Sequence, residues 1–272
     1  MIDDVKKVQL QERLSFLAKD DILLAFSGGA DSALVLALLA EVCKTKKSRL
    51  FAVYINTALM PSRDEGQAKE LAQRLGVEFF TIALDEWKDP AIIRNTLDRC
   101  YYCKKRLFET LKEQASALGC VHVVDGTNHD DLQSYRPGLK AIAELGIVSP
   151  LAEVGFTKNE VREYLQTLGL EVAHRPSSPC LATRIPYGTV LEPTLLKRIE
   201  KAELYLKTFG FYNVRVRLHG EVVRLEIDRE DFDLLMNNRD TIVKELKRLG
   251  FVYLTLDLEG FRSGSLDVSL KR

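Results

Sequence analysis

A glycine-rich turn between two apolar runs is the feature that most restricts the fold of this chain. The turn reads F-S-G-G-A-D-S over residues 26–32, and its setting predicts a buried strand, a tight turn and a helix. Because Gly28 and Gly29 lack a Cβ, their backbone N–H groups can approach an anion closely. A helix that begins near Asp31 adds the positive end of its dipole. We therefore expect the turn to bind the phosphates of a nucleotide.

The spacing of this turn differs from the two commonest phosphate loops, since it contains neither G-x-x-x-x-G-K-[ST] nor G-x-G-x-x-G. The pattern S-G-G-x-D-S resembles the PP-loop of the ATP pyrophosphatase superfamily, whose members cleave ATP between its α- and β-phosphates and transfer AMP to a substrate oxygen. The resemblance implies that ATP is bound by Ser27, Gly28, Gly29, Asp31 and Ser32. The alternative is an ordinary polar turn in which Asp31 or Ser32 caps the helix.

Strands and helices alternate along the first half of the chain. We expect strands at 22–25, 50–55, 77–82 and 121–124, and helices at 3–18, 31–43, 63–75 and 101–118. This order is typical of an α/β fold with a doubly wound parallel sheet, here of the PP-loop ATP pyrophosphatase type.

A second polar loop, D-G-T-N-H-D-D at 125–131, follows the fourth predicted strand. Ligands of open α/β sheets bind at the carboxyl ends of the strands. We therefore expect Asp125, Asn128 and Asp131 to face the nucleotide and its Mg²⁺, with Gly126 also binding ATP. A polar surface loop fits the same residues.

Prolines between residues 176 and 193 interrupt the helical pattern, and the sequence changes character beyond them. We place a domain boundary here, with a PP-loop domain at 1–185 and a smaller α+β domain for substrate binding and oligomerisation at 186–272. The C-terminal part is expected to contain helices at 195–209 and 241–249 and strands at 214–218, 222–227 and 252–256.

The charge balance argues against large charged partners. Lys plus Arg number 39 and Asp plus Glu number 39, so no net field favours nucleic acid or a membrane surface. No apolar run approaches the roughly 20 residues that span a bilayer, and the amino terminus has no long hydrophobic region. We expect a soluble, cytoplasmic protein.

The cysteines point to metal or sulfur chemistry. Cys100 and Cys103 form C-x-x-C in a lysine-rich segment, and at the start of a helix two such residues project from nearly the same face. Cys180 can supply a third ligand, because nearby Arg175 and Arg184 favour its thiolate.

Three thiolates suit an iron–sulfur cluster with one iron open to a sulfide. Zinc with His129 or His174 as fourth ligand, and a redox pair formed by the C-x-x-C, are the alternatives. Cys43 and Cys120 are expected to be small buried hydrophobic residues.

Motifs along most of the chain together resemble the LarE family of PP-loop sulfurtransferases, which help to make the nickel-pincer nucleotide of lactate racemase. Besides the two loops, the resemblance rests on Y-R-P-G-L-K-A (135–141), S-P-L (149–151), C-L-A-T-R-I-P-Y-G (180–188), V-R-V-R (214–217) and L-D-L-E-G-F-R-S-G (256–264). It implies that ATP adenylates a carboxylate of pyridinium-3,5-biscarboxylic acid mononucleotide, with release of pyrophosphate. Sulfur then displaces AMP and leaves a thiocarboxylate.

The resemblance implies two possible sources of sulfur. Some LarE proteins sacrifice a cysteine, and Cys180 lies in the corresponding segment. The additional Cys100 and Cys103 resemble three-cysteine members, in which three thiolates hold a 4Fe-4S cluster and a sulfide on its fourth iron is donated. We favour the cluster because the sacrificial version gives the C-x-x-C no role. The expected catalytic residues are Cys180, Asp31 and Glu203, and the expected cofactors are ATP, Mg²⁺ and the cluster.

Charged residues of the C-terminal part are candidates for substrate binding. Arg215 and Arg217 alternate along a predicted strand and so lie on one face, where two guanidiniums can grip a phosphate. Arg184 and Arg262 are further candidates. Glu203 and Glu226 resemble family positions near the sulfur site, as general base or metal contact. Each of these residues also fits a solvated surface charge.

Two other functions remain open at this point. PP-loop enzymes with cysteine clusters also thiolate tRNA, although the charge balance disfavours a nucleic acid partner. The second function is that of a PP-loop protein that binds a nucleotide or a metal without turnover. Measurable pyrophosphate release would exclude it. The LarE resemblance implies a sulfide source, other nickel-pincer biosynthesis proteins as partners, and a homohexamer.

Overall fold

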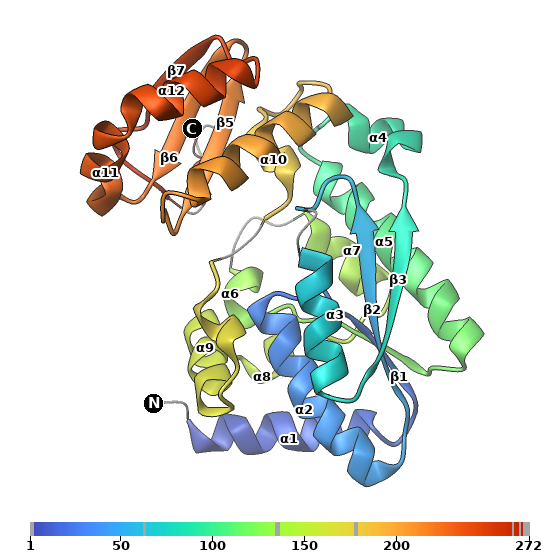
Figure 1. Cartoon of the computed structure of the whole chain (residues 1–272). Coiled ribbons are helices and arrows are strands. Elements are labelled where there is room, and N and C mark those ends of the chain that lie inside the picture. The colour runs from blue at the N-terminus through green and yellow to red at the C-terminus, as the bar shows by residue number, and fades with distance from the viewer. Residues whose placement is uncertain are drawn as a thin grey trace. The chain divides into compact units, whose positions relative to one another are not determined.

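The computed structural model describes residues 3–61, 64–133, 137–176, 179–262, 264–266 and 268. Tyr135 and Arg136 of one family motif, and Arg63, where a helix is expected to begin, lie outside these ranges. The chain forms two compact units (Figure 1). The N-terminal unit comprises residues 1–58, 62–92 and 98–177, and the C-terminal unit comprises 59–61, 93–97 and 178–272.

The N-terminal unit is built on a parallel sheet of four strands in the order β3-β2-β1-β4. The strands are β1 (Ile22–Ala25), β2 (Leu50–Thr57), β3 (Glu78–Leu84) and β4 (His122–Val124). Ile22 lies beside Leu50 on one side and His122 on the other, so the three strands start level with one another. The carboxyl ends of β1 and β4 therefore meet at one edge, which is where both polar loops begin.

Helices cover both faces of this sheet (Figure 1). Ile22 and Leu24 of β1 pack with helices on one face, whereas Leu23 packs with helices on the other. The first face is covered by α1 (Asp4–Leu17), α2 (Ala30–Lys46), α3 (Asp64–Arg74), α8 (Pro150–Val154) and α9 (Lys158–Thr167), and the second by α5 (Arg99–Leu118) and α7 (Gly138–Glu144). The expected doubly wound α/β sheet is thus confirmed.

Several elements were not expected from the sequence. They are the helices α7, α8 and α9 given above, the helices α4 (Pro90–Ile93), α6 (His129–Leu132) and α11 (Phe232–Asn237), and the 3₁₀ turns η1 (Glu86–Lys88), η2 (Glu171–His174), η3 (Leu181–Arg184) and η4 (Arg229–Asp231). None of the described helices is long and apolar enough to cross a membrane.

The C-terminal unit is a smaller α+β structure with a mixed sheet in the order β5-β6-β7. Its main elements are α10 (Pro193–Lys207), β5 (Val214–His219), β6 (Val222–Ile227), α12 (Arg239–Arg248) and β7 (Tyr253–Leu256). Strands β5 and β6 are antiparallel, and β7 runs parallel to β6. The unit also holds two segments from earlier in the chain. Backbone N–H groups of Leu181 and Leu191 donate to the carbonyls of Leu59 and Ile93, at 2.7 and 2.9 Å.

Candidate active site

The glycine-rich turn joins β1 to α2. Gly28 adopts a left-handed φ of 74°, which glycine reaches without steric cost, and Gly29 is the N-cap of α2. Within the described chain no side chain caps this helix end. The hydroxyl of Ser32 donates to the Gly29 carbonyl at 3.1 Å and lies 3.2 Å from the hydroxyl of Ser27. The first N–H groups of α2 are thus left to bind an anion, as a phosphate cradle requires.

Gly126, in the loop after β4, packs against the first turn of α2. A Cβ added at Gly126 would lie 2.6 Å from the backbone nitrogen of Ser32, 2.8 Å from its Cα and 3.0 Å from the carbonyl carbon of Asp31. These are fixed backbone atoms, so this position demands glycine because of close approach. The second loop therefore supports the phosphate cradle from beside it.

Asp125 orders the second loop from inside. Its side chain is buried and accepts hydrogen bonds from the hydroxyls of Ser149 and Thr127, both at 2.6 Å, and from the Thr127 backbone N–H at 3.1 Å. Ser149 belongs to the S-P-L motif at the start of α8, so the structure gives that motif a role. A carboxylate with three donors is held in one position.

Asp31 lies at the centre of a small polar network in the first turn of α2. Its carboxylate accepts from the Asn128 side-chain amide at 3.1 Å and from the Lys158 ammonium at 2.5 Å. Asn128 and Asp131 also cap α6 reciprocally, the Asp131 N–H donating to Asn128 and the Asn128 N–H to Asp131. The second loop and the start of α9 thus converge on the phosphate cradle.

Lys158 is the residue that the sequence analysis missed. It is the first residue of α9, and its side chain is about one third exposed. The helix start carries a sequence signature, because Thr157 and Glu160 form a capping box of the T-x-x-E type. That signature locates the helix, whereas only the tertiary structure brings Lys158 to Asp31.

Cys100 and Cys103 are the second and fifth residues of α5, as expected from a C-x-x-C at a helix start. The buried Arg99 guanidinium donates to the Cys100 sulfur at 3.3 Å. Cys180 precedes η3 in the C-terminal unit. All five cysteines lie in described ranges, and none forms a disulfide. Across those ranges, no group of three or more His, Cys, Asp or Glu side chains is arranged to hold a metal ion.

The environments of the cysteines differ. Burial raises the pKa of the Cys43 thiol and raises that of Cys120 to about 11. A raised pKa lowers the thiolate fraction of both. Cys43 is buried as expected, whereas Cys120 is only half-buried, so the expectation of a buried residue is wrong for Cys120. The two thiols of the C-x-x-C have the donor chemistry that an iron–sulfur cluster requires, with a guanidinium beside one of them.

Arg184 and Glu203 form a buried ion pair in the C-terminal unit. Nε and Nη2 of Arg184 donate to the two oxygens of Glu203 at 2.6 and 3.0 Å. Oε1 of Glu203 also accepts from the Val216 backbone N–H of β5 at 2.9 Å. Both side chains are less than one tenth exposed. Glu203 is therefore tied to an arginine and a strand.

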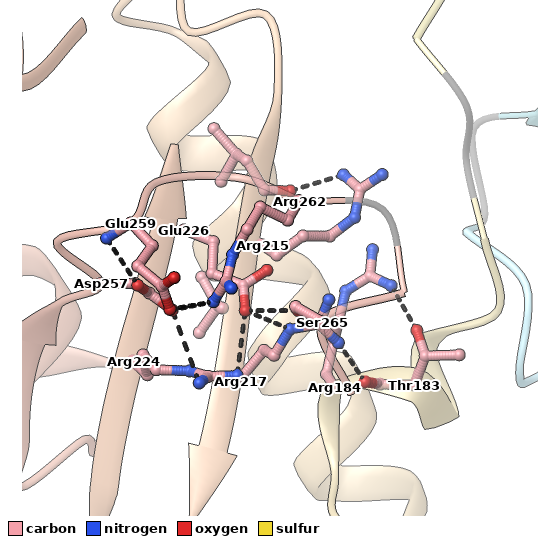
Figure 2. A network of polar contacts seen from close by, with 12 residues as sticks. Thr183, Arg184, Arg215, Arg217, Arg224, Glu226, Asp257, Glu259, Arg262 and Ser265 are labelled. Atoms are coloured by element: carbon pink, nitrogen blue, oxygen red, sulfur yellow. Dashed lines mark hydrogen bonds and ion pairs between the residues drawn. The ribbon is translucent and has the colours of Figure 1, made fainter. Parts of the chain in front are cut away.

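Glu226 of β6 is the centre of a second buried network, which Figure 2 shows. Its Oε1 accepts from Arg217 at 2.6 Å, Ser265 at 2.7 Å and Arg224 at 3.0 Å. Arg217 also donates to the Thr183 carbonyl at 2.6 Å. Oε2 of Glu226 is buried without a hydrogen-bond partner among the described residues.

Arg215 is a buried cation close to these two networks. It donates to the Val214 carbonyl at 2.7 Å, and its guanidinium lies 5.0 Å from the ring centre of Phe261. Burial, reinforced by the guanidiniums of Arg184 and Arg217, lowers the pKa of Arg215 to about 10. A charge that is costly to bury would be stabilised by an anion.

Arg262, the last of the residues expected to bind the substrate, lies nearer the surface. Its Nη2 is 2.7 Å from a carboxylate oxygen of Glu259 and 3.7 Å from one of Asp257. Arg224 also approaches Asp257, at 3.5 Å. Five arginines and four carboxylates, between Arg184 and Arg262, thus meet in this unit.

Comparison with known proteins agrees with this architecture. Residues 3–179 match the model of the family described as a PP-loop domain. The chain is 37% identical to the pyridinium-3,5-bisthiocarboxylic acid mononucleotide synthase of Lactiplantibacillus plantarum, covering 98% of this chain and 95% of the synthase. An uncharacterized protein of Synechocystis is 39% identical over 91% of this chain and 92% of its own. The glutamine-hydrolysing GMP synthase of Campylobacter lari is 28% identical over 76% of this chain and 44% of that synthase.

The cradle, the parallel sheet and the family match define an ATP-binding enzyme of the PP-loop ATP pyrophosphatase class. Within this class, the similarity over nearly the whole of both chains shows that the protein belongs to the LarE family of ATP-dependent sulfurtransferases. The resemblance inferred from the sequence motifs is thus confirmed.

Proposed function

We propose that this enzyme converts a carboxylate of pyridinium-3,5-biscarboxylic acid mononucleotide into a thiocarboxylate, with release of AMP and pyrophosphate, in the biosynthesis of the nickel-pincer cofactor. The observation that carries this proposal is the 37% identity to the L. plantarum synthase, because it extends over 98% of the chain and so includes both units. A substrate with a phosphate and two carboxylates also suits a unit that buries several arginines.

The N-terminal unit would activate the carboxylate. The N–H groups at the start of α2 and the hydroxyls of Ser27 and Ser32 would hold the phosphates of ATP, and Asp31 would hold Mg²⁺. An oxygen of the substrate carboxylate attacks the α-phosphorus, and pyrophosphate leaves with the electron pair of the broken P–O bond. Lys158, already beside Asp31, would stabilise the charge that develops on pyrophosphate.

Activation is needed because a carboxylate is anionic and lacks a good leaving group, whereas its mixed anhydride with AMP has one. A sulfur nucleophile then attacks the carbonyl carbon, and AMP leaves with the carbon–oxygen bond electrons. Arg215 would hold the substrate phosphate, since its burial makes a neighbouring anion favourable.

Cys100, Cys103 and Cys180 would hold a 4Fe-4S cluster, which supplies an iron without a protein ligand where a sulfide can be carried. The two thiols near the start of α5 and the Arg99 guanidinium beside Cys100 fit such a group. This function implies three kinds of partner: a sulfide source, other proteins of nickel-pincer biosynthesis, and five further copies of the chain in a homohexamer.

The test begins with protein purified without oxygen. We expect about four irons and four acid-labile sulfides per chain, pyrophosphate release that depends on the dicarboxylate mononucleotide, and an unchanged polypeptide mass after turnover. Cys100→Ser should lose iron and multiple turnover, whereas the matched control Cys43→Ser should keep both.

Two results would contradict the proposal in different ways. A protein without iron that loses about 34 Da, the mass of H₂S, after one turnover would make Cys180 a sacrificed donor and leave the substrate unchanged. Pyrophosphate release that requires tRNA in place of the mononucleotide, and that fails in modest salt, would assign the enzyme to tRNA thiolation.

A further inference from the structure

Cys180 and the 3₁₀ turn η3 that follows it, together called the Cys180 turn, are hydrogen-bonded to two buried ion pairs. These pairs are Arg184–Glu203 and Arg217–Glu226. The first connection begins at Glu203, whose carboxylate binds Arg184 through two hydrogen bonds. Nη1 of Arg184 donates to the Thr183 hydroxyl at 2.7 Å, and that hydroxyl donates to the carbonyl of Cys180, also at 2.7 Å. Nη1 further lies 3.4 Å from the carbonyls of Pro179 and Cys180. A continuous chain of hydrogen bonds thus links α10 to the backbone of Cys180.

The second connection begins at Glu226 on β6. Its carboxylate binds Nε of Arg217, and Nη1 of Arg217 donates to the backbone carbonyl of Thr183 at 2.6 Å. Thr183 is therefore the junction of the two ion pairs, its hydroxyl serving one and its carbonyl the other, as Figure 2 shows. The N–H of Leu181 completes the attachment through its bond to Leu59.

These contacts occupy most of the donors of Arg184, and they occupy Nε and Nη1 of Arg217. A guanidinium has five N–H groups, and those of Arg184 face both oxygens of a carboxylate, a hydroxyl and two carbonyls. Arg184 is 2% exposed and Arg217 is 5% exposed. To bind a phosphate with these groups, Arg184 would have to leave the buried Glu203 carboxylate without its cation, which is costly. Arg217 would have to give up Glu226, to which Arg224 and Ser265 would stay bonded, or the Thr183 carbonyl.

We propose that Arg184 and Arg217 are positioning residues, and that with Glu203 and Glu226 they clamp the Cys180 turn in place for sulfur transfer. This assignment rests on the proposed function, in which Cys180 takes part, and it replaces the expected roles of Arg184 and Arg217 as phosphate ligands and of Glu203 as a general base. A fixed backbone at Cys180 holds its sulfur, or whatever that sulfur binds, at a constant place.

Thr183 provides a test that spares both ion pairs. Thr183→Val removes the hydroxyl but keeps the carbonyl that Arg217 binds, and the matched control Thr183→Ser keeps both. In full-length protein freed of bound metal, we expect Thr183→Val and Glu203→Gln to raise the rate of Cys180 alkylation by iodoacetamide at least fivefold. Thr183→Ser should stay within twofold of the parent. Cys43 and Cys120, read in the same mass spectra, should not change, because the N-terminal unit stays folded.

Turnover kinetics separate positioning from substrate binding. A clamp predicts that Thr183→Val lowers kcat for sulfur transfer with an unchanged KM for the mononucleotide, and that Arg217→Lys does the same. An Arg217→Lys enzyme with a raised KM and an unchanged kcat would make Arg217 a phosphate ligand. Cys180 alkylation that is equal in Thr183→Val and the parent would also overturn the clamp.

The alkylation experiment uses no substrate, so it separates this inference from the proposed function. Faster alkylation of Cys180 in a protein that never thiolates the mononucleotide would support the clamp while removing the proposed reaction. Normal thiolation of the mononucleotide with no change in Cys180 alkylation would support the proposed reaction and overturn the clamp.

Discussion

Replacing Gly126 with alanine tests whether the second loop supports the phosphate cradle. The added Cβ would lie 2.6 Å from the Ser32 nitrogen, about 0.8 Å short of the 3.4 Å at which ordinary contact begins. The atoms that it meets are backbone atoms in the first turn of α2, so no side chain can rotate away. Either α2 or the loop that contains Asp125 must move.

The cost of such a shift follows from the packing of protein interiors. Inserting a carbon into a filled site destabilises a protein by about 1–3 kcal/mol. ATP binding needs the first turn of α2 in its original place, so restoring that place on binding weakens the affinity for ATP. If the full 1–3 kcal/mol opposes binding, the Kd for MgATP rises about five- to 150-fold. Calorimetric titration with MgATP and thermal unfolding of the same samples measure both effects.

Gly66 in α3 is the matched control. A Cβ at Gly66 meets no described atom within 4 Å, and alanine is favoured over glycine in a helix by about 0.5–1 kcal/mol. Gly66→Ala should therefore raise Tm slightly and leave the Kd for ATP unchanged. A Gly126→Ala protein with the Tm and the ATP affinity of the parent would refute the packing argument.

Three further changes test the charges and thiols. Lys158→Met should slow pyrophosphate release at least about tenfold. It should change the free energy of unfolding by less than about 1 kcal/mol, because the ion pair of Lys158 with Asp31 is partly exposed. An unchanged release rate would show that Lys158 does not act in the site. Arg215→Met should raise the free energy of unfolding at pH 7 by about 1–2 kcal/mol while KM for the mononucleotide rises. The sign follows because the folded-state pKa of about 10 lies below the ordinary value of an arginine, so the burial cost is fully present below pH 10 and disappears as the pH rises above it. Urea unfolding at pH 7 measures this gain, and a destabilised variant would contradict it. Cys120, with a pKa of about 11, should be about one-thousandth ionised at pH 8, and its alkylation should accelerate about tenfold per pH unit up to pH 11. Fast alkylation at pH 8 would show that this pKa is not raised.

The fold could be predicted because its signals are local. Alternate residues of β1 enter two cores, and the glycine-rich turn marks where strand gives way to helix. Element ends moved by only a few residues, as for α5, which begins at Arg99 where the pattern suggested Tyr101. The short helices α6 and α8 were missed because four or five residues carry too little periodicity.

The candidate site was harder to predict because its contacts are distant in sequence. Asp31 and Lys158 are 127 residues apart, so no window of sequence joins them. Asn128 and Asp131 have side chains that suit both a metal and a helix cap, and in the structure they cap α6. For Arg217, strand alternation predicts the face of the sheet on which the side chain lies. It does not predict that the guanidinium binds the carboxylate of Glu226.

The assignment of residues 59–61 and 93–97 to the C-terminal unit makes the enzyme poorly modular. A cut or fusion near residue 178 would remove from the C-terminal unit two segments that bind Leu181 and Leu191 through their backbone, and would leave those segments as loose loops on the other half. Shuffling of whole domains between relatives would thus break hydrogen bonds beside Cys180. New substrates would be reached more easily by substitutions within an intact chain than by exchange of its C-terminal part.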